Sequence, residues 1–217
     1  MIKLKDILRR HSLIENANDS PPPVKFVSPP SDHSYSKAAG TSAGKPYTQD
    51  NIDFSELSGS EDVNARALNV IKAFENNINN PRGGYNKKTK LWYPHKSLEG
   101  GNDTIAYGHK IKNGEDYSKG ISDNDAIKLL QRDINDKIAV AKQHLAGFDQ
   151  FPLSIRIAIL NGLFRGDLGP KAIGYLDSHQ FGKAAKEYLN HAEYRATNNK
   201  GIKNRMEWNA KVFKNAA

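Results

Sequence analysis

The strongest constraint on the fold is an abrupt change in the sequence near residue 60. Residues 16–60 hold 6 of the 10 prolines and nine serines, with no periodic apolar residues. Such a composition cannot bury enough apolar surface to fold and predicts a disordered or extended linker. From residue 61, apolar residues recur with helical spacing. We therefore expect a short amphipathic leader or docking segment at 1–15, a Pro/Ser-rich linker at 16–60 and a folded domain at 61–217.

Charge and composition narrow the function classes. The chain has 32 basic and 24 acidic residues, and residues 61–217 alone carry 25 and 17 of them, a net charge of +8. A basic domain favours an anionic partner, which is nucleic acid, a membrane surface or a cell-wall polymer. The absence of cysteine excludes a disulfide framework and a thiolate metal site. No apolar run is long enough to span a membrane, and no secretory signal is visible.

The folded domain is predicted to be α+β. A helix is expected over 63–78, stopped by Pro81, and a small irregular sheet over 82–112. Ser122 and Asp125 resemble a capping box that opens the next helix. Five helices are expected after the sheet, over 122–145, 152–164, a short one from 170, 181–189 and 202–213. A small sheet lobe and a larger helical lobe would leave a cleft between them.

Glu75 is the first candidate catalytic residue. It follows Phe74 at the edge of the apolar face of its helix, near the helix end and just before the predicted sheet. Partial desolvation at such a place favours the protonated carboxyl that a general acid needs. The alternative is a solvated helix glutamate without a catalytic role. Polar residues on the glycine-rich hairpin at 95–109 favour catalysis, because a glutamate beside such a hairpin is a layout suited to a glycosidase.

Four segments of the folded domain carry motifs that occur together in one known family. Thr-Ile-Ala-Tyr-Gly-His at 104–109 is similar to a Thr-Ile-Gly-Tyr-Gly-His strand, and Val-Ile-Lys-Ala-Phe-Glu at 70–75 to a first helix that ends in a catalytic glutamate. Residues 156–164 are similar to a buried central helix, and 201–207 to a Gly-Leu-x-x-Arg-x-x-Glu run. Together, and in this order, they resemble the phage-type lysozymes, glycoside hydrolase family 24, which include many endolysins. The resemblance covers about 65–217 and implies a lysozyme-like fold.

The resemblance also implies roles for two residues. Glu75 would protonate the glycosidic oxygen, and Thr104 would hold the water or shape the site on the opposite face of the sugar. The two are farther apart in sequence than is usual in the family, and we assign the excess, 79–90, to an elongated hairpin. The family's second acidic residue stands six residues before the threonine, where this chain has Leu98.

Three residues compete for the missing second role. Glu99 is favoured because it is one position away on a glycine-flanked loop. Asp103 adjoins Thr104, but strand alternation points it to the other face, and Ser97 is one position off on the other side. With Glu99 in place, an inverting hydrolase is expected. Without it, a single glutamate would give the lytic transglycosylase reaction that some relatives use.

Aromatic and histidine residues near the hairpin are candidate substrate-binding groups. Tyr107 and Trp92 are predicted to stack on sugars, with core packing as an equal alternative. His109 matches the family's terminal histidine and is expected to be structural or to line the cleft. The histidines lack the regular spacing of a zinc site, so neither a metal nor another cofactor is expected.

Several buried or basic residues outside the hairpin are expected to have structural roles. Asn161 lies inside the most apolar helix and therefore needs a hydrogen-bond partner. The arginines expected to hold carboxylates or to lie at the hinge of the cleft are Arg156, Arg165 and Arg205.

The leading functional hypothesis is a peptidoglycan hydrolase that cleaves the β-1,4 bond between N-acetylmuramic acid and N-acetylglucosamine. The alternatives are a lytic transglycosylase on the same bond, or a non-catalytic wall-binding or virion structural module; nucleic-acid binding is not expected. We expect a monomer that acts as a phage endolysin, reaching the periplasm from the host cytoplasm through a holin, or as a lysozyme carried in the virion. Particle proteins would then bind residues 1–60, where Leu13-Ile14-Glu15 resembles a leader-cleavage signal.

Overall fold

The structure of the protein, a computed structural model, describes residues 41–42, 45–46, 62–75, 83–97 and 101–216. All of them belong to one compact unit, Ser34–Ala217. The predicted leader lies outside the described residues, and so does most of the predicted linker. Within the linker, β1 (Thr41–Ser42) pairs with β2 (Lys45–Pro46) in an antiparallel arrangement that the sequence did not indicate.

The first helix of the folded part is α2 (Val63–Glu75). Its buried residues recur at intervals of three and four, as the sequence predicted, and are Ala67, Val70, Ile71 and Phe74. Glu75 is its last residue. The predicted end at residues 79–81 lies outside the described part of the chain.

The predicted small sheet is present as two antiparallel sheets of three strands each. The first joins β3 (Tyr85–Asn86), β4 (Leu91–Trp92) and β8 (Ile121–Ser122), and the second joins β5 (His95–Lys96), β6 (Asp103–Ile105) and β7 (His109–Lys110). β3 and β4 form a hairpin in the described part of the connection where one was expected over 79–90, and it extends to Trp92. β8 was not predicted, because its residues stand directly before α3 and Ser122 was assigned to the start of that helix.

The helices that follow agree with the predicted order. Ser122 caps α3 (Asp123–His144): the amide of Asp125 donates to the Ser122 hydroxyl at 3.2 Å, and that hydroxyl donates to the Asp125 carboxylate at 2.7 Å. This confirms the predicted capping pair. The remaining helices are α4 (Leu153–Arg165), α5 (Pro170–Asp177), α6 (Phe181–Leu189), α7 (Ala192–Ala196) and α8 (Lys200–Asn215), with a 3-10 turn η3 (Phe148–Gln150) before α4. The one-turn helix α7 and η3 were not predicted.

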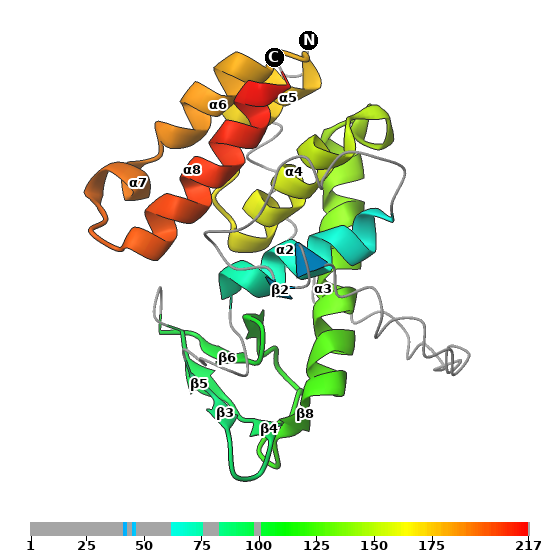
Figure 1. The fold of residues 1–217 in the computed structure, drawn as a ribbon, viewed down its shortest axis with the longest axis vertical. Helices are drawn as coiled ribbons and strands as arrows, with labels where there is room; N and C mark the ends of the chain where they lie inside the picture. The colour runs from blue at the N-terminus through cyan, green and yellow to red at the C-terminus, as the bar shows by residue number, and fades with distance from the viewer. Residues whose placement is uncertain (1–40, 43–44, 47–61, 76–82, 98–100, 217) are drawn as a thin grey trace. The chain divides into compact units, whose positions relative to one another are not determined.

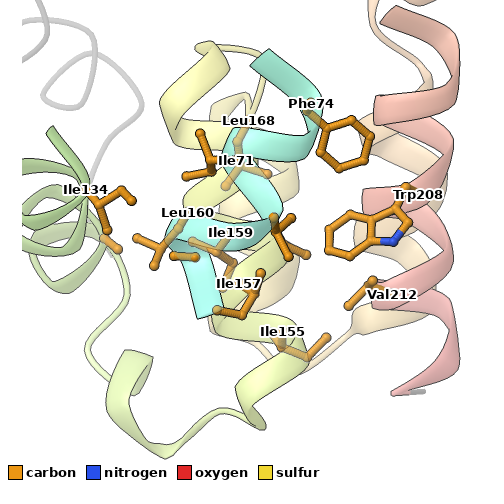
Figure 2. Packing of buried hydrophobic residues seen from close by; sticks show 14 of the residues in the cluster. Ile71, Phe74, Ile134, Ile155, Ile157, Ile159, Leu160, Leu168, Trp208 and Val212 are labelled. Carbon is orange, nitrogen blue, oxygen red and sulfur yellow. The ribbon is translucent and has the colours of Figure 1, made fainter. Parts of the chain in front are cut away.

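The core forms around α4, which is apolar on nearly every side and contacts α2, α3 and α8. Figure 2 shows the isoleucines of α4 between Ile71 of α2, Ile134 of α3 and Val212 of α8. Phe74 of α2 meets Trp208 of α8 edge to face, with 5.6 Å between ring centroids. The C-terminal end of α2, where Glu75 lies, is therefore fixed by packing against α8.

The helix α3 connects the two kinds of structure. It contacts β4, β7 and β8 as well as α2 and α4, and it runs from the strands to the other helices (Figure 1). Because strands and helices follow one another in separate blocks, the described chain is an α+β structure. Among the described residues, no helix is long and apolar enough to cross a membrane.

Candidate active site

Glu75 is held by a buried arginine from the far end of the chain. Nη1 of Arg205, on α8, donates to Oε1 of Glu75 at 2.5 Å. The Arg205 side chain is buried, whereas that of Glu75 is 21% exposed. The sequence had indicated that Arg205 holds a carboxylate, and this ion pair confirms it. The carboxyl is thus fixed on one oxygen and still reachable by solvent.

Asn161 fixes the arginine in turn. Nε and Nη2 of Arg205 donate to Oδ1 of Asn161 at 3.0 and 2.7 Å, and the guanidinium lies 5.5 Å from the centre of the Phe74 ring. Asn161 is fully buried in α4. The fork of Arg205 therefore has one orientation, with Nη1 directed at Glu75. The expectation that Asn161 needs a structural partner is confirmed.

The turn between β6 and β7 lies against the other oxygen of Glu75. A Cβ placed on Gly108 would be 2.8 Å from Oε2 of Glu75, and Gly108 has φ +84°. Only glycine fits here without strain, because an L side chain disfavours this backbone conformation and would also collide with the carboxyl. Gly108 belongs to the predicted 104–109 motif, so the motif and Glu75 do meet.

Thr104 lies on β6, buried, directly opposite His95 of β5. Its hydroxyl donates to the backbone carbonyl of His95 at 3.2 Å. The hydroxyl hydrogen is therefore used within the sheet, while the oxygen keeps lone pairs that accept a hydrogen bond from water.

The carboxylate of this hairpin that the structure describes, Asp103, does not lie on the Thr104 side of β6. Asp103 is 59% exposed and forms an ion pair with Lys96 at 3.0 Å, on the face opposite Thr104, as strand alternation predicted. Glu99, the favoured candidate, lies outside the described residues. Ser97 closes the same connection through its backbone, since its amide donates to the carbonyl of Asn102 at 2.8 Å.

Trp92 and Tyr107 are core residues, so their assignment to sugar stacking is corrected. Both are buried, and their rings pack at 5.2 Å between centroids. Nε1 of Trp92 and the hydroxyl of Tyr107 both donate to Oδ1 of Asp123, at 2.9 and 2.6 Å. Burial, together with the Asp123 carboxylate, raises the pKa of Tyr107, which therefore stays a donor. Rings held this way have no open face for a ligand.

Lys72 is a residue that sequence analysis missed. It precedes Glu75 by one helical turn, and its Nζ lies 4.8 Å from the centre of the Tyr107 ring. Burial lowers the pKa of Lys72, and the nearby Asp123 carboxylate partly opposes this. The sequence around Lys72 looks like that of an ordinary surface lysine on a helix. The aromatic ring against which it packs, that of Tyr107, comes from the turn after β6.

His109 is held between two carboxylates and does not line an open surface. Nδ1 contacts Oδ2 of Asp133 at 2.8 Å, Nε2 contacts Oε2 of Glu115 at 2.9 Å, and the side chain is 4% exposed. Burial by itself lowers the pKa of His109, but the hydrogen bonds and charges of Asp133 and Glu115 outweigh it, so the pKa is raised. His109 therefore has the structural role that was one of its two expected roles. Its assignment as a substrate-binding residue is corrected, because its ring is buried between Asp133 and Glu115.

The His109 cluster predicts a specific pH dependence of stability. A raised histidine pKa adds stability that is complete below the unfolded value of 6.5 and is lost as the pH rises through the folded value. The pKa of Glu115 is lowered despite burial, by the Lys112 amide and His109, so its contribution is present above 4.5 and is lost at lower pH. The difference in unfolding free energy between wild type and His109→Gln should therefore be largest between these two values. Urea denaturation across the pH range measures it, and a difference independent of pH would contradict the account.

Arg165 also holds carboxylates, as predicted: Nη1 donates to Asp167 at 2.8 Å and Nη2 to Glu193 at 2.7 Å. No ion pair joins Arg156 to a carboxylate in the described part of the chain.

A hollow of about 510 Å³ lies elsewhere on the helical part, lined by Tyr175, Lys183, Lys186, Glu187, Leu189 and Asn190. None of these is a predicted site residue. We assign the candidate site to Glu75 because a buried arginine and the closely packed Gly108 turn converge on its carboxyl.

Comparison with known proteins adds no identification. No known family model matches the sequence, and no curated protein matches it.

Proposed function

We propose that this protein is a peptidoglycan hydrolase of lysozyme-like fold, with Glu75 as the general acid that protonates the glycosidic oxygen. One observation carries the proposal. The segments 70–75, 104–109, 156–164 and 201–207, which lie far apart in the sequence, all contribute to the surroundings of the Glu75 carboxyl. A solvated helix glutamate without a function would not need a buried arginine on one oxygen and a glycine with positive φ packed against the other.

The proposed cleavage of the glycosidic bond uses Glu75 on one face of the sugar and Thr104 with a second carboxyl on the opposite face. Glu75 gives its proton to the leaving oxygen, and Arg205 then stabilises the carboxylate that remains. In the inverting reaction a water hydrogen-bonded to Thr104 attacks the anomeric carbon from the opposite face of the sugar as the bond to the leaving oxygen breaks, and a second carboxylate takes the proton that the water loses. Glu99 stays the proposed second carboxyl, since Asp103 is engaged by Lys96 on the other face of β6.

The nature of the products tests the reaction. Incubating the protein with purified peptidoglycan and weighing the released fragments by mass spectrometry should give muropeptides with reducing ends. Fragments lighter by one water, with anhydro-muramic ends, would assign the lytic transglycosylase reaction, which needs only one carboxyl and is favoured by the engagement of Asp103 elsewhere. Binding to the wall without any release would point to the non-catalytic module.

We also propose the setting in which the reaction occurs. The net charge of +8 favours adsorption to an anionic cell wall. Phage lysozymes of this kind reach the wall from inside the host, through a membrane pore, or are delivered by the particle. Attachment to particle proteins through residues 1–60 would serve the second route.

Gly108 offers a direct test of the geometry around Glu75. Gly108→Ala should lower the free energy of unfolding by about 1–2 kcal/mol through its positive φ, and should also lower wall-lytic activity by about 10²-fold, because the added Cβ displaces the carboxyl. Gly114→Ala is the matched control, since Gly114 has φ +87° with nothing within 4 Å. Urea denaturation and a turbidity assay measure both effects. Equal activity losses in the two variants would refute the placement of Glu75.

A further inference from the structure

The hydrogen bonds that hold Arg205 continue deep into the helical core. Nδ2 of Asn161 donates to Oδ1 of Asn209 at 2.9 Å, Nδ2 of Asn209 donates to the Tyr188 hydroxyl at 2.7 Å, and that hydroxyl donates to Oδ1 of Asp167 at 2.6 Å. All four residues are buried. They come from α4, α6, α8 and the connection after α4, so the hydrogen bonds join three helices of the bundle.

Asp167, at the inner end of this series of hydrogen bonds, fixes the direction of every bond in it. The carboxylate of Asp167 is only an acceptor, so Tyr188 must donate to it and accept from Asn209. Asn209 then presents its oxygen to Asn161, and Asn161 presents its own oxygen to Arg205. If any amide were turned over, two donors would face each other.

The inner end is itself firmly held. Arg165, whose side chain is 5% exposed, donates to Oδ2 of Asp167 at 2.8 Å. A Cβ on Gly162 would be 3.4 Å from Oδ1 of Asp167 and 3.5 Å from the Tyr188 hydroxyl, so the backbone of α4 passes close to both. The carboxylate therefore has little freedom to turn.

We propose that Asn209, Tyr188 and Asp167 are positioning residues for Glu75. None of them touches the carboxyl. They set the orientation of the Asn161 amide, which holds the fork of Arg205, and the fork holds Oε1 of Glu75. The proposal rests on the proposed function in one respect, that Glu75 is the acid.

Stability alone does not explain this arrangement. Apolar side chains of similar volume in place of a buried polar network are often neutral or stabilising. From Asp167 to Arg205 the hydrogen-bonded residues are buried, and Glu75 beyond them is partly exposed. At the other end, Arg165 holds Asp167 and also pairs with Glu193, whose side chain is 36% exposed. A buried network that ends on the carboxyl of Glu75 is suited to presenting that carboxyl in one orientation.

Two nearly isosteric variants test the proposal. Tyr188→Phe removes the hydroxyl through which Asp167 fixes the orientation of the Asn209 amide. Asp167→Asn is expected to turn its oxygen to Arg165 and its amide nitrogen to Tyr188, which reverses every bond up to Arg205. Each should lower the kcat of peptidoglycan cleavage by about tenfold with little change in KM. Ile155→Val, a buried change on α4 away from the chain of hydrogen bonds, controls for loss of core packing and should keep kcat.

A second readout does not depend on activity. In the wild type and in Ile155→Val, the fixed fork should give separate nitrogen-15 NMR signals for the two Nη groups of Arg205. Rotation of the guanidinium should merge these signals in Tyr188→Phe and Asp167→Asn. In an Arg205→Lys background, which lacks the fork, Tyr188→Phe should cause no further loss of kcat.

The outcomes separate the two proposals. Merged signals in both variants, with the kcat loss confined to the background that has Arg205, support positioning. Separate signals and unchanged kcat in folded Tyr188→Phe and Asp167→Asn would overturn it, as would an equal kcat loss in the Arg205→Lys background. Merged signals in the variants together with no cleavage even by the wild type would support the positioning chain and reject peptidoglycan hydrolysis instead.

Discussion

Glu75→Gln is expected to reduce the rate at which the protein clears outer-membrane-permeabilised Gram-negative cells by a factor on the order of 10²–10⁴. Glutamine has the shape of glutamate and keeps an oxygen that accepts from Nη1 of Arg205, so the protein should stay folded. It has no proton to give to a glycosidic oxygen. Turbidity loss, measured at equal concentrations of folded protein, reports the effect.

The control for this substitution is Glu187→Gln. Glu187 is a helix glutamate with a similar side-chain exposure, 26%, and its closest cation, Lys171, is 4.0 Å away on the exposed surface. Its replacement should leave the lytic rate within about twofold, because surface substitutions away from a site cost little. Comparable rates for Glu75→Gln and wild type would remove Glu75 from the mechanism.

Arg205→Met should have the largest effect on stability. Methionine has a similar length but cannot donate, so Oδ1 of the fully buried Asn161 loses two hydrogen bonds and Oε1 of Glu75 loses its partner. Breaking a buried charged pair costs about 3–5 kcal/mol. Because Glu75 is partly exposed and can bind water instead, we expect about 3 kcal/mol, near the lower end of that range. Urea denaturation near neutral pH measures the loss.

The same substitution at an exposed arginine is the comparison for Arg205. Arg132 pairs with Glu115 at 3.1 Å, but its side chain is 53% exposed. Arg132→Met should cost less than about 1 kcal/mol, because water replaces the lost partner. If the two substitutions lowered the unfolding free energy equally, the buried role of Arg205 would be refuted.

The helices were predictable because each carries its own signal. The apolar residues of α4 follow Pro152, and Ser122 and Asp125 mark the start of α3 within four residues of sequence. Such local patterns need no knowledge of distant partners. The helix α7 was missed because five residues are too short for periodicity to appear, and β8 because it adjoins the start of α3.

The site was predictable only in part, for a related reason. Glu75, Thr104 and Asn161 were identified from local motifs and from polarity inside an apolar helix. The burial of Trp92 and Tyr107 depends on Asp123, which comes from a later helix, so the sequence left stacking and packing equally open. The hydrogen bonds through Asn209 and Tyr188 have only a weak signal in the sequence, which is that Asn209 is a polar residue on the apolar face of α8. Its continuation to Asp167 depends on tertiary contacts alone.

The release of new reducing ends from purified peptidoglycan, by the wild type and by Glu75→Gln in parallel, tests the central claim most directly. We expect steady release by the wild type and none above background by the variant, with both proteins folded by circular dichroism. Equal release by the two would show that Glu75 is not the acid, and no release by a folded wild type would contradict glycosidic hydrolysis by this protein.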